Sequence, residues 1–223
     1  MSSKVFLIRH GETEWSLNQQ HTGSTEVPLT SNGEEQVRRT ARTFVGDGKM
    51  IQPKCIKHIE RARRTLQLLG LGDQNQSSAH IIITELLQEW DYGDYEGLTI
   101  DEMGAKVESK SEYSHFRLSI NQSILISFRS PQDVAARLDK LIGEIREFNG
   151  ADSTAKNIHD SPAGADIVCV AHGHILPALA LRWAEQPLQH GMRLLLETAG
   201  VGVLCFEHES FEEPAVVLGA RAE

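Results

Sequence analysis

The chain has 223 residues, of which 40% are hydrophobic and 24% are charged, and this composition excludes a fibrous repeat and an intrinsically disordered protein. The length fits one domain, which we expect to cover residues 1–223. The formal net charge of −9 disfavours nucleic acid and anionic membranes as partners. We therefore expect any anionic ligand to be a small molecule, bound where a few cations converge.

Short apolar runs that end in loops predict three strands in the first half of the chain, at residues 4–8, 55–59 and 81–84. A helix is predicted at residues 33–45, because turn and capping residues precede apolar positions at helical spacing. A second helix is predicted at residues 61–70. Strands and helices alternate in this half.

The second half continues this alternation. Residues 131–148 carry the clearest helical stripe of the chain, formed by Val134, Leu138, Leu141, Ile145 and Phe148. A buried strand at 165–171 precedes a helix at 176–184, and two strands close the chain at 202–206 and 215–218. The alternation predicts an α/β fold, a three-layer α/β/α sandwich with a mostly parallel central sheet.

Two segments fit this pattern poorly. Residues 103–130 have no clean period and receive no predicted structure, and residues 152–164, rich in Ser, Asp, Pro and Ala, are predicted to form an exposed loop.

Cysteine usage and the amino terminus indicate the compartment. The three cysteines, Cys55, Cys169 and Cys205, lie in or beside apolar runs without metal-ligand spacing, so we expect buried, reduced thiols. The first residues lack the long apolar core and the cleavage site of a signal peptide, and no stretch reaches membrane-spanning length. We therefore expect a cytoplasmic protein, with the nucleus as an alternative compartment.

Histidine-glycine pairs follow two of the predicted strands. Arg9, His10 and Gly11 end the first strand, and His172-Gly173 ends the strand at 165–171. Ligands of open α/β sheets bind at the carboxyl ends of strands, and a histidine whose tautomer is fixed is a good nucleophile toward phosphorus. We therefore expect the two histidines to share a site beside Arg9. The other histidines, including His21, His58 and His190, are interpreted as structural or left undecided.

Several segments in the same order resemble the histidine phosphatase (phosphoglycerate mutase-like) superfamily. They are RHGETEWSLNQQHTGSTEVPLT at 9–30, EWDYGDYEG at 89–97, VAHGHILPALALRW at 170–183 and AGVGVLCFEHESFEEPAVVLG at 199–219. The last segments are especially similar to fungal phosphatases of the sedoheptulose-bisphosphatase type.

The resemblance implies a role for each matching residue. His10 would carry the phosphoryl group, Glu89 would protonate the leaving oxygen, and His172 would bind and polarise the phosphoryl group. Arg9 and Arg61 would clamp the phosphate. Residues that would contribute to the substrate pocket are Ser16, Thr22, Gly23, Tyr92 and Gly173.

The chemistry of phosphoryl transfer agrees with these roles. Two guanidinium groups and histidine supply positive charge around the phosphoryl oxygens, so we expect neither a metal nor a cofactor. Glu89 must be protonated, and desolvation by Trp90, Tyr92 and Tyr95 would favour this, although ordinary packing explains these aromatics equally well.

The resemblance also has departures. The connection before Arg61 lacks the usual Ser-Pro turn, residues 104–130 differ from the family's pocket-covering segment, and Pro177 stands where fungal relatives tend to have Arg. The sequence predicts a phosphatase for small phosphorylated metabolites, such as a sugar phosphate or bisphosphate, acting through a phosphohistidine. Two alternatives stay open: a weakened member that acts as a binding protein, and a mutase, which Ser16 disfavours because mutases have Asn there. The sequence also leaves open a homo-oligomer.

Overall fold

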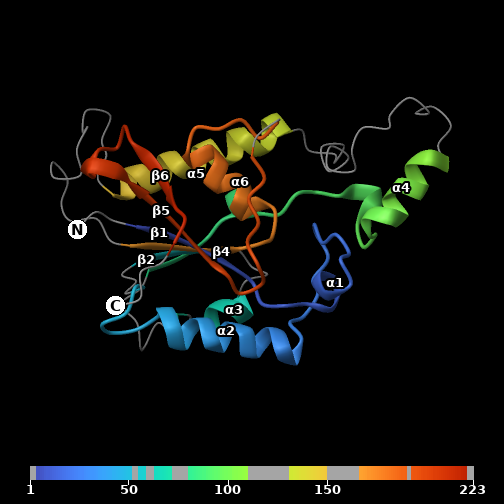
Figure 1. Cartoon of the computed structure of the whole chain (residues 1–223), viewed down its shortest axis with the longest axis horizontal. Coiled ribbons are helices and arrows are strands. Elements are labelled where there is room, and N and C mark those ends of the chain that lie inside the picture. The colour runs from blue at the N-terminus through green and yellow to red at the C-terminus, as the bar shows by residue number, and fades with distance from the viewer. Residues whose placement is uncertain are drawn as a thin grey trace.

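A central six-stranded sheet organises the computed structural model, with the strand order β3-β2-β4-β1-β5-β6 (Figure 1). The strands are β1 (Val5–Arg9), β2 (Cys55–His58), β3 (His80–Ile83), β4 (Ile167–Ala171), β5 (Val201–Phe206) and β6 (Pro214–Val217). The structure describes residues 4–51, 55–58, 63–71, 80–109, 131–149, 166–189 and 192–219.

The sheet is mixed. β3, β2, β4 and β1 pair in parallel, whereas β5 pairs antiparallel with both β1 and β6. The α/β class predicted from the sequence is confirmed, whereas the sheet is mixed where a mostly parallel one was expected. The antiparallel pairing of β5 with β6 follows from the short connection between them, which suits a hairpin and not a helical crossover.

Helices lie on both sides of the sheet. The helices are α1 (Glu14–Leu17), α2 (Ser31–Phe44), α3 (Arg63–Leu68), α4 (Ile100–Ser109), α5 (Pro131–Phe148) and α6 (Ile175–Trp183). Figure 1 shows α2 and α3 on one side and α5 and α6 on the other. Single 3₁₀ turns occupy Glu85–Leu87, Gly93–Tyr95 and Glu207–Glu209.

Side chains on both faces of the inner strands are buried, because helices cover both faces of the sheet. Val5 and Leu7 belong to the core cluster that includes the apolar side chains of α5 and α6. Phe6 and Ile8 belong to a second cluster, which includes Val37 of α2. The central strand therefore contributes side chains to two cores, which explains its near-continuous apolar sequence.

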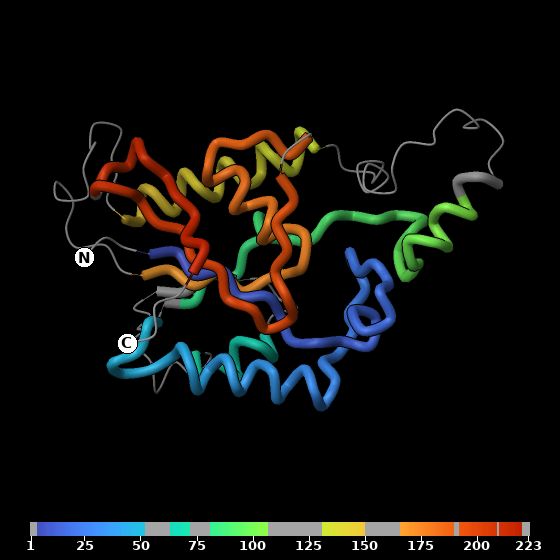
Figure 2. Tube along the Cα trace, in the orientation of Figure 1, coloured from blue at the N-terminus to red at the C-terminus, as the bar shows by residue number. Residues whose placement is uncertain are grey.

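The elements beyond the carboxyl end of β1 bring distant segments together. Figure 2 shows the chain leaving β1 toward α1, while the segment after β3 runs toward α4 on the same side of the molecule. The backbone N–H of His21 donates to the Leu98 carbonyl, and the Gly97 N–H donates to the His21 carbonyl. These bonds hold the two segments side by side.

The structure corrects several expectations from the sequence. Residues 100–109 form α4, although residues from 103 onward were expected to have no assigned structure. Cys169 is a buried free thiol as expected, but Cys205 is only partly buried. The side chain of Cys55 and residues 152–164 lie outside the described residues. None of the helices that the structure describes is both long enough and apolar enough to cross a membrane.

Candidate active site

Strand register brings His10 and His172 together. Arg9 of β1 pairs with Ala171 of β4, and the His10 N–H donates to the Ala171 carbonyl at 3.0 Å. Each histidine is therefore the first residue after its strand at the same edge of the sheet. The centroids of the two rings are 5.2 Å apart and their planes cross at 64°. This juxtaposition is the one that the two strand ends predicted.

The tautomer of His10 is fixed by its neighbour. The Nδ1 atom lies 2.7 Å from the carbonyl oxygen of Gly11, and because a carbonyl only accepts, Nδ1 carries the proton. The lone pair of the neutral ring is consequently on Nε2. Nε2 is the atom that can attack an electrophile.

A close backbone contact holds the loop that presents His10. A Cβ atom at Gly11 would overlap the carbonyl oxygen of Gly33, so glycine is needed for the loop to approach α2 this closely. Glu12 strengthens the contact, because its carboxylate accepts from the Thr30 hydroxyl at 2.6 Å and from the Asn32 amide at 3.0 Å. The Thr30 hydroxyl in turn accepts from the Gly33 N–H and caps α2.

Arg9 supplies a partly desolvated positive charge. Its Nη1 donates to the Leu196 carbonyl at 2.8 Å, and a Cβ at Gly173 would lie only 2.9 Å from its Cζ. Burial lowers the pKa of the Arg9 guanidinium, and the charges of Glu89 and Glu197 act in the opposite direction. The buried Nε has no hydrogen-bond partner among the described residues.

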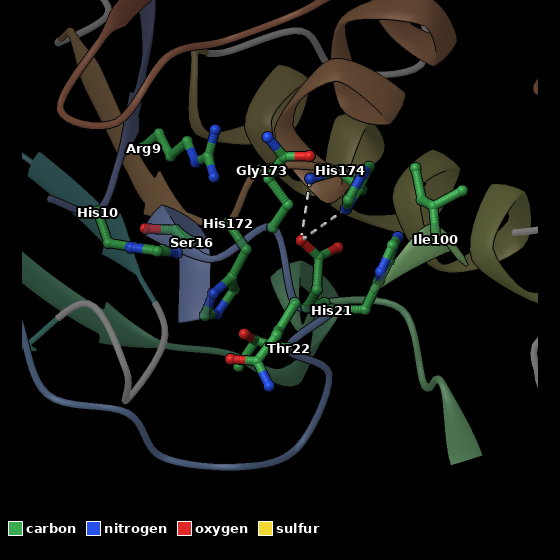
Figure 3. Close-up of a pocket in the computed structure, with 12 residues that line it drawn as sticks. Arg9, His10, Ser16, His21, Thr22, Ile100, His172, Gly173 and His174 are labelled. Carbon is green, nitrogen blue, oxygen red and sulfur yellow. Dashed lines mark hydrogen bonds and ion pairs between the residues drawn. The ribbon is translucent and has the colours of Figure 1, made fainter. Parts of the chain in front are cut away.

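Glu89 is buried behind the histidines, with 4% of the residue exposed. Its Oε1 accepts from the Trp90 N–H at 3.0 Å, and its Oε2 accepts from the His174 N–H at 2.9 Å. The Nδ1 atom of His174 lies 3.7 Å from the same Oε2, and dashed lines in Figure 3 mark both contacts with His174.

The charge of Glu89 differs from the sequence expectation. Burial is the largest influence and raises the pKa of the carboxyl. Hydrogen bonding to His174 and the positive charges of His174 and His172 act in the opposite direction, and together they hold the pKa at about 2. Trp90 and Tyr92 are part of the hydrophobic core, and they do not keep Glu89 protonated. That expectation was wrong, because it considered desolvation without the two histidines.

These residues surround a pocket of about 210 Å³ (Figure 3). The predicted site residues that line it are Arg9, His10, Ser16, Thr22, Glu89, His172 and Gly173. Gly23 packs against the ring of Tyr92, whose hydroxyl contacts His174 in the pocket wall. Nine of the ten predicted site residues thus lie in or directly beside one pocket.

Two predicted features need qualification. Arg61 lies outside the described residues, as do the connection before it and residues 110–130 of the atypical segment. The hydroxyl of Ser16 accepts from the Thr13 N–H at 2.8 Å and donates to the Thr13 carbonyl at 2.9 Å. Ser16 thus helps to cap α1 and also lines the pocket.

Other pocket residues were not predicted. They are Gln19, Gln20, His21, Ile100 and His174. The sequence assigned no role in the site to His21. Its ring nevertheless stacks on that of His174, with centroids 5.8 Å apart and planes at 5°. Each of these histidines is adjacent in sequence to a predicted pocket residue, since His21 precedes Thr22 and His174 follows Gly173. This adjacency could not reveal that the two rings meet.

The described residues contain one group with the spacing of a cation site. It consists of Glu207, His208 and Glu213, all exposed, and none of the three lines the pocket. Among the described residues that line the pocket, Arg9 is the one that carries a permanent positive charge able to bind an anion.

Comparison with known proteins finds relatives over nearly the whole chain. The chain matches the family described as histidine phosphatase superfamily (branch 1) over residues 5–217. It is 27% identical to sedoheptulose 1,7-bisphosphatase of Saccharomyces cerevisiae, over 98% of this chain and 93% of the yeast protein. It is 31% identical to an acid phosphatase of Mycobacterium tuberculosis, over 92% of this chain and 87% of that protein.

A solved structure is similar to this one over nearly the whole chain. The product of an open reading frame of Mycobacterium tuberculosis superposes with a TM-score of 0.71 at 29% identity, over 98% of this chain and 97% of that chain. The family match spans both strand ends that bear His10 and His172, and it includes Glu89. The chain therefore belongs to the histidine phosphatase superfamily.

Proposed function

We propose that this protein is a phosphatase that hydrolyses small phosphorylated metabolites through a phosphohistidine on Nε2 of His10. Membership of the superfamily and relatives named as phosphatases support phosphatase activity on phosphorylated substrates. The observation that carries the intermediate is the hydrogen bond from His10 Nδ1 to the Gly11 carbonyl, because it leaves the lone pair on Nε2 of a histidine that lines the same pocket as Arg9 and His172.

In the first step, Nε2 of His10 attacks phosphorus, the N–P bond forms and the P–O bond to the leaving group breaks. The guanidinium of Arg9 and the ring of His172 stabilise the negative charge on the phosphoryl oxygens. Glu89 takes up a proton when the anionic substrate binds, because a neighbouring negative charge disfavours the carboxylate, and it delivers this proton to the leaving oxygen, which departs as an alcohol.

In the second step, water attacks phosphorus and the N–P bond breaks, returning the electron pair to Nε2 of His10. Glu89, now a carboxylate, accepts the proton that the attacking water loses. Inorganic phosphate leaves and the site returns to its starting state. Protein side chains supply every charge in this cycle, so we propose that it needs neither metal nor cofactor.

The substrate class follows from the lining of the pocket and from one relative. Gln19, Gln20 and Thr22 offer amide and hydroxyl groups suited to a polyhydroxyl leaving group. The relative from Saccharomyces cerevisiae is named for a sugar bisphosphate. We therefore propose a sugar phosphate or bisphosphate, handled by a single cytoplasmic domain of this chain.

Release of inorganic phosphate from a panel of sugar monophosphates and bisphosphates tests the proposal. We expect turnover by the unaltered protein and a loss of about 10³-fold or more in His10→Asn, which lacks the nucleophile. His208→Asn is the matched control, because His208 is exposed and asparagine tolerates its φ of 47°. This control should keep full activity.

Three outcomes would contradict the proposal. Phosphate moved to a second hydroxyl of the sugar would identify a mutase, and binding without turnover would identify a weakened family member. Full activity of His10→Asn would exclude His10 as the nucleophile.

A further inference from the structure

One stretch of the pocket wall belongs to no helix or strand. We call residues 20–25 the pocket loop, and its first three residues, Gln20, His21 and Thr22, line the pocket, in which Figure 3 shows His21 and Thr22. The ladder of hydrogen bonds that fixes a regular element does not hold such a loop. Groups that recognise a substrate must nevertheless be held to within about 0.5 Å. The contacts that fix the pocket loop therefore decide what the pocket accepts.

The first half of the pocket loop is fixed by residues 97 and 98, which follow Glu89 on the same segment. The His21 N–H donates to the Leu98 carbonyl at 3.0 Å, and the Gly97 N–H donates to the His21 carbonyl at 2.8 Å. The side-chain amide of Gln20 donates to the Gly97 carbonyl at 2.7 Å. These bonds end at residue 21, so another group has to fix the loop beyond Thr22.

Glu96 fixes the second half of the pocket loop. Its Oε2 accepts from the Gly23 N–H at 3.1 Å. Its Oε1 accepts from the N–H groups of Ser24 at 2.8 Å and Thr25 at 2.7 Å. An ionised carboxylate accepts at both oxygens and has no proton of its own, which suits three donors. Thr22 therefore lies between two anchored stretches of backbone.

The backbone that bears Glu96 is itself held in place. Glu96 follows the 3₁₀ turn Gly93–Tyr95, and its N–H donates to the Gly93 carbonyl at 3.1 Å. The next residue, Gly97, has a φ of 76°, which favours glycine, and a Cβ there would lie 3.1 Å from Cη2 of Trp15 in α1. The carboxylate is thus carried by a fixed turn, to which the pocket loop is attached.

No gap separates the pocket loop from this segment. A Cβ atom at Gly23 would lie 2.6 Å from Oε2 of Glu96 and 2.6 Å from the Trp90 carbonyl oxygen. It would also lie 3.0 Å from Cδ2 of Tyr92. The loop rests directly on the stretch that begins with Glu89, the proposed acid, so any loss of the Glu96 bonds changes the position of the loop relative to the acid.

We propose that Glu96 is a positioning residue that makes the pocket selective for sugar phosphates by acting through Thr22, an inference that rests on the proposed function. In that function the Thr22 hydroxyl contacts a hydroxyl group of the sugar. Glu96 is not one of the described residues that line the pocket. It acts on the substrate by holding the backbone beside Thr22, and the phosphoryl group itself is bound without it.

Glu96→Gln tests this inference. Glutamine has nearly the same shape, but its amide accepts at one oxygen, so at least one of the three backbone N–H groups loses its acceptor. For a sugar phosphate we expect KM to rise about 10-fold with kcat nearly unchanged, because a contact to the sugar is made equally in the ground state and in the transition state. For p-nitrophenyl phosphate, which has no sugar hydroxyl, both constants should change by less than about 2-fold.

Glu102→Gln is the matched control for this substitution. The Glu102 carboxylate also accepts from a backbone N–H, that of Thr99 at 2.8 Å, and from the Thr99 hydroxyl at 2.9 Å. These bonds stay at the start of α4 and do not reach the pocket loop. The preference of this variant for the sugar phosphate over p-nitrophenyl phosphate should equal that of the unaltered protein.

A double-mutant cycle with Thr22→Val shows whether Glu96 acts through Thr22. Valine nearly keeps the shape of threonine and removes the hydroxyl, so Thr22→Val alone should raise KM for the sugar phosphate as Glu96→Gln does. Once the hydroxyl is gone, adding Glu96→Gln should raise KM by less than about 2-fold more. Denaturant unfolding checks that each variant folds, and Thr22→Val tests the inference even where Glu96→Gln does not.

The possible failures have different meanings. Equal losses on the sugar phosphate and on p-nitrophenyl phosphate would overturn the role of Glu96, because the whole pocket would then have changed. Additive effects in the cycle, or an unchanged KM in Thr22→Val, would also overturn it while leaving His10 as the nucleophile. If the unaltered protein releases phosphate from neither substrate, the proposed function itself fails and this inference fails with it.

Discussion

The charge of Glu89 is the property of a single residue that most constrains the chemistry. A carboxylate buried to this degree normally has a raised pKa, but here the histidines on one side of the pocket reverse the direction. Glu89 therefore rests as a carboxylate and must take up a proton before it can act as an acid.

Glu89→Gln tests the role of this carboxyl. Glutamine has nearly the same shape but cannot transfer a proton, so we expect kcat to fall by about 10²–10⁴-fold on a sugar phosphate. On an aryl phosphate, whose leaving group needs no proton, the loss should be much smaller. Steady-state kinetics on both substrates make the comparison, and equal losses would indicate that Glu89 only positions other groups.

The same substitution has a consequence for stability. The pKa of Glu89 is about 2 in the folded protein, against an ordinary value of 4.5. The depressed pKa stabilises the fold fully above about pH 4.5, and this stabilisation is lost as the pH falls toward 2. Urea unfolding at pH 6 and pH 3 should therefore show that acid destabilises the unaltered protein more than Glu89→Gln. An equal dependence on pH would contradict the depressed pKa.

For single residues, the sequence predicts which ones belong to the site better than it predicts the contacts between them. His10 and His172 could be found because each follows an apolar strand and precedes a glycine. The contact of His174 with Tyr92 joins residues 82 positions apart, and no local pattern encodes it. The charge of Glu89 depends on that same contact network, which is why desolvation alone predicted the wrong direction.

Among the elements, the junction between the His10 loop and α2 determines where the nucleophile sits. The loop and the first turn of α2 approach so closely that neither Gly11 nor Gly33 has room for a side chain. Thr30 and Glu12 add hydrogen bonds across the same junction.

Gly11→Ala tests this junction. The added Cβ would overlap the Gly33 carbonyl and meet Cγ2 of Val37 at 2.9 Å, so the loop must shift. We expect the free energy of unfolding to fall by about 1–3 kcal/mol and kcat to fall with it.

Gly143→Ala is the matched control for this substitution. Gly143 lies within α5 and has no atom within 4 Å of an added Cβ. Alanine there should leave kcat unchanged and raise stability by up to about 1 kcal/mol. Denaturant unfolding and steady-state kinetics measure both variants, and an unaltered kcat in Gly11→Ala would contradict the role of the junction.

The sequence predicted elements well where their signals were local. The stripe of α5 and the cap of α2 gave helices close to their actual bounds, with α2 beginning at Ser31 because Thr30 caps it. Pro177 lies in the first turn of α6, where a missing N–H costs no helical hydrogen bond. α4 was missed because residues 100–109 were judged together with the aperiodic stretch that follows them.

For the molecule as a whole, the net charge does not describe the pocket. The chain carries a formal charge of −9, yet Arg9 and four histidines line the pocket. Short-range contacts dominate over a screened net charge at such distances. An acidic protein can therefore bind an anionic metabolite while repelling polyanions.

Because protein side chains supply the positive charge in the pocket, we expect activity to be independent of divalent cations. We expect kcat to be unchanged after dialysis against EDTA, and added Mg²⁺ or Zn²⁺ should not increase it. Loss of activity with EDTA, restored by either ion, would show that a metal takes part in the transfer.

The most direct test of the central claim is to trap the intermediate on His10. Protein quenched during turnover of a labelled sugar phosphate should carry a phosphoryl group that is stable in base and labile in acid, and peptide mass spectrometry should locate it at His10. His10→Asn should carry no label, while His208→Asn should be labelled like the unaltered protein. A label on another residue, or turnover without any labelled protein, would contradict the phosphohistidine mechanism.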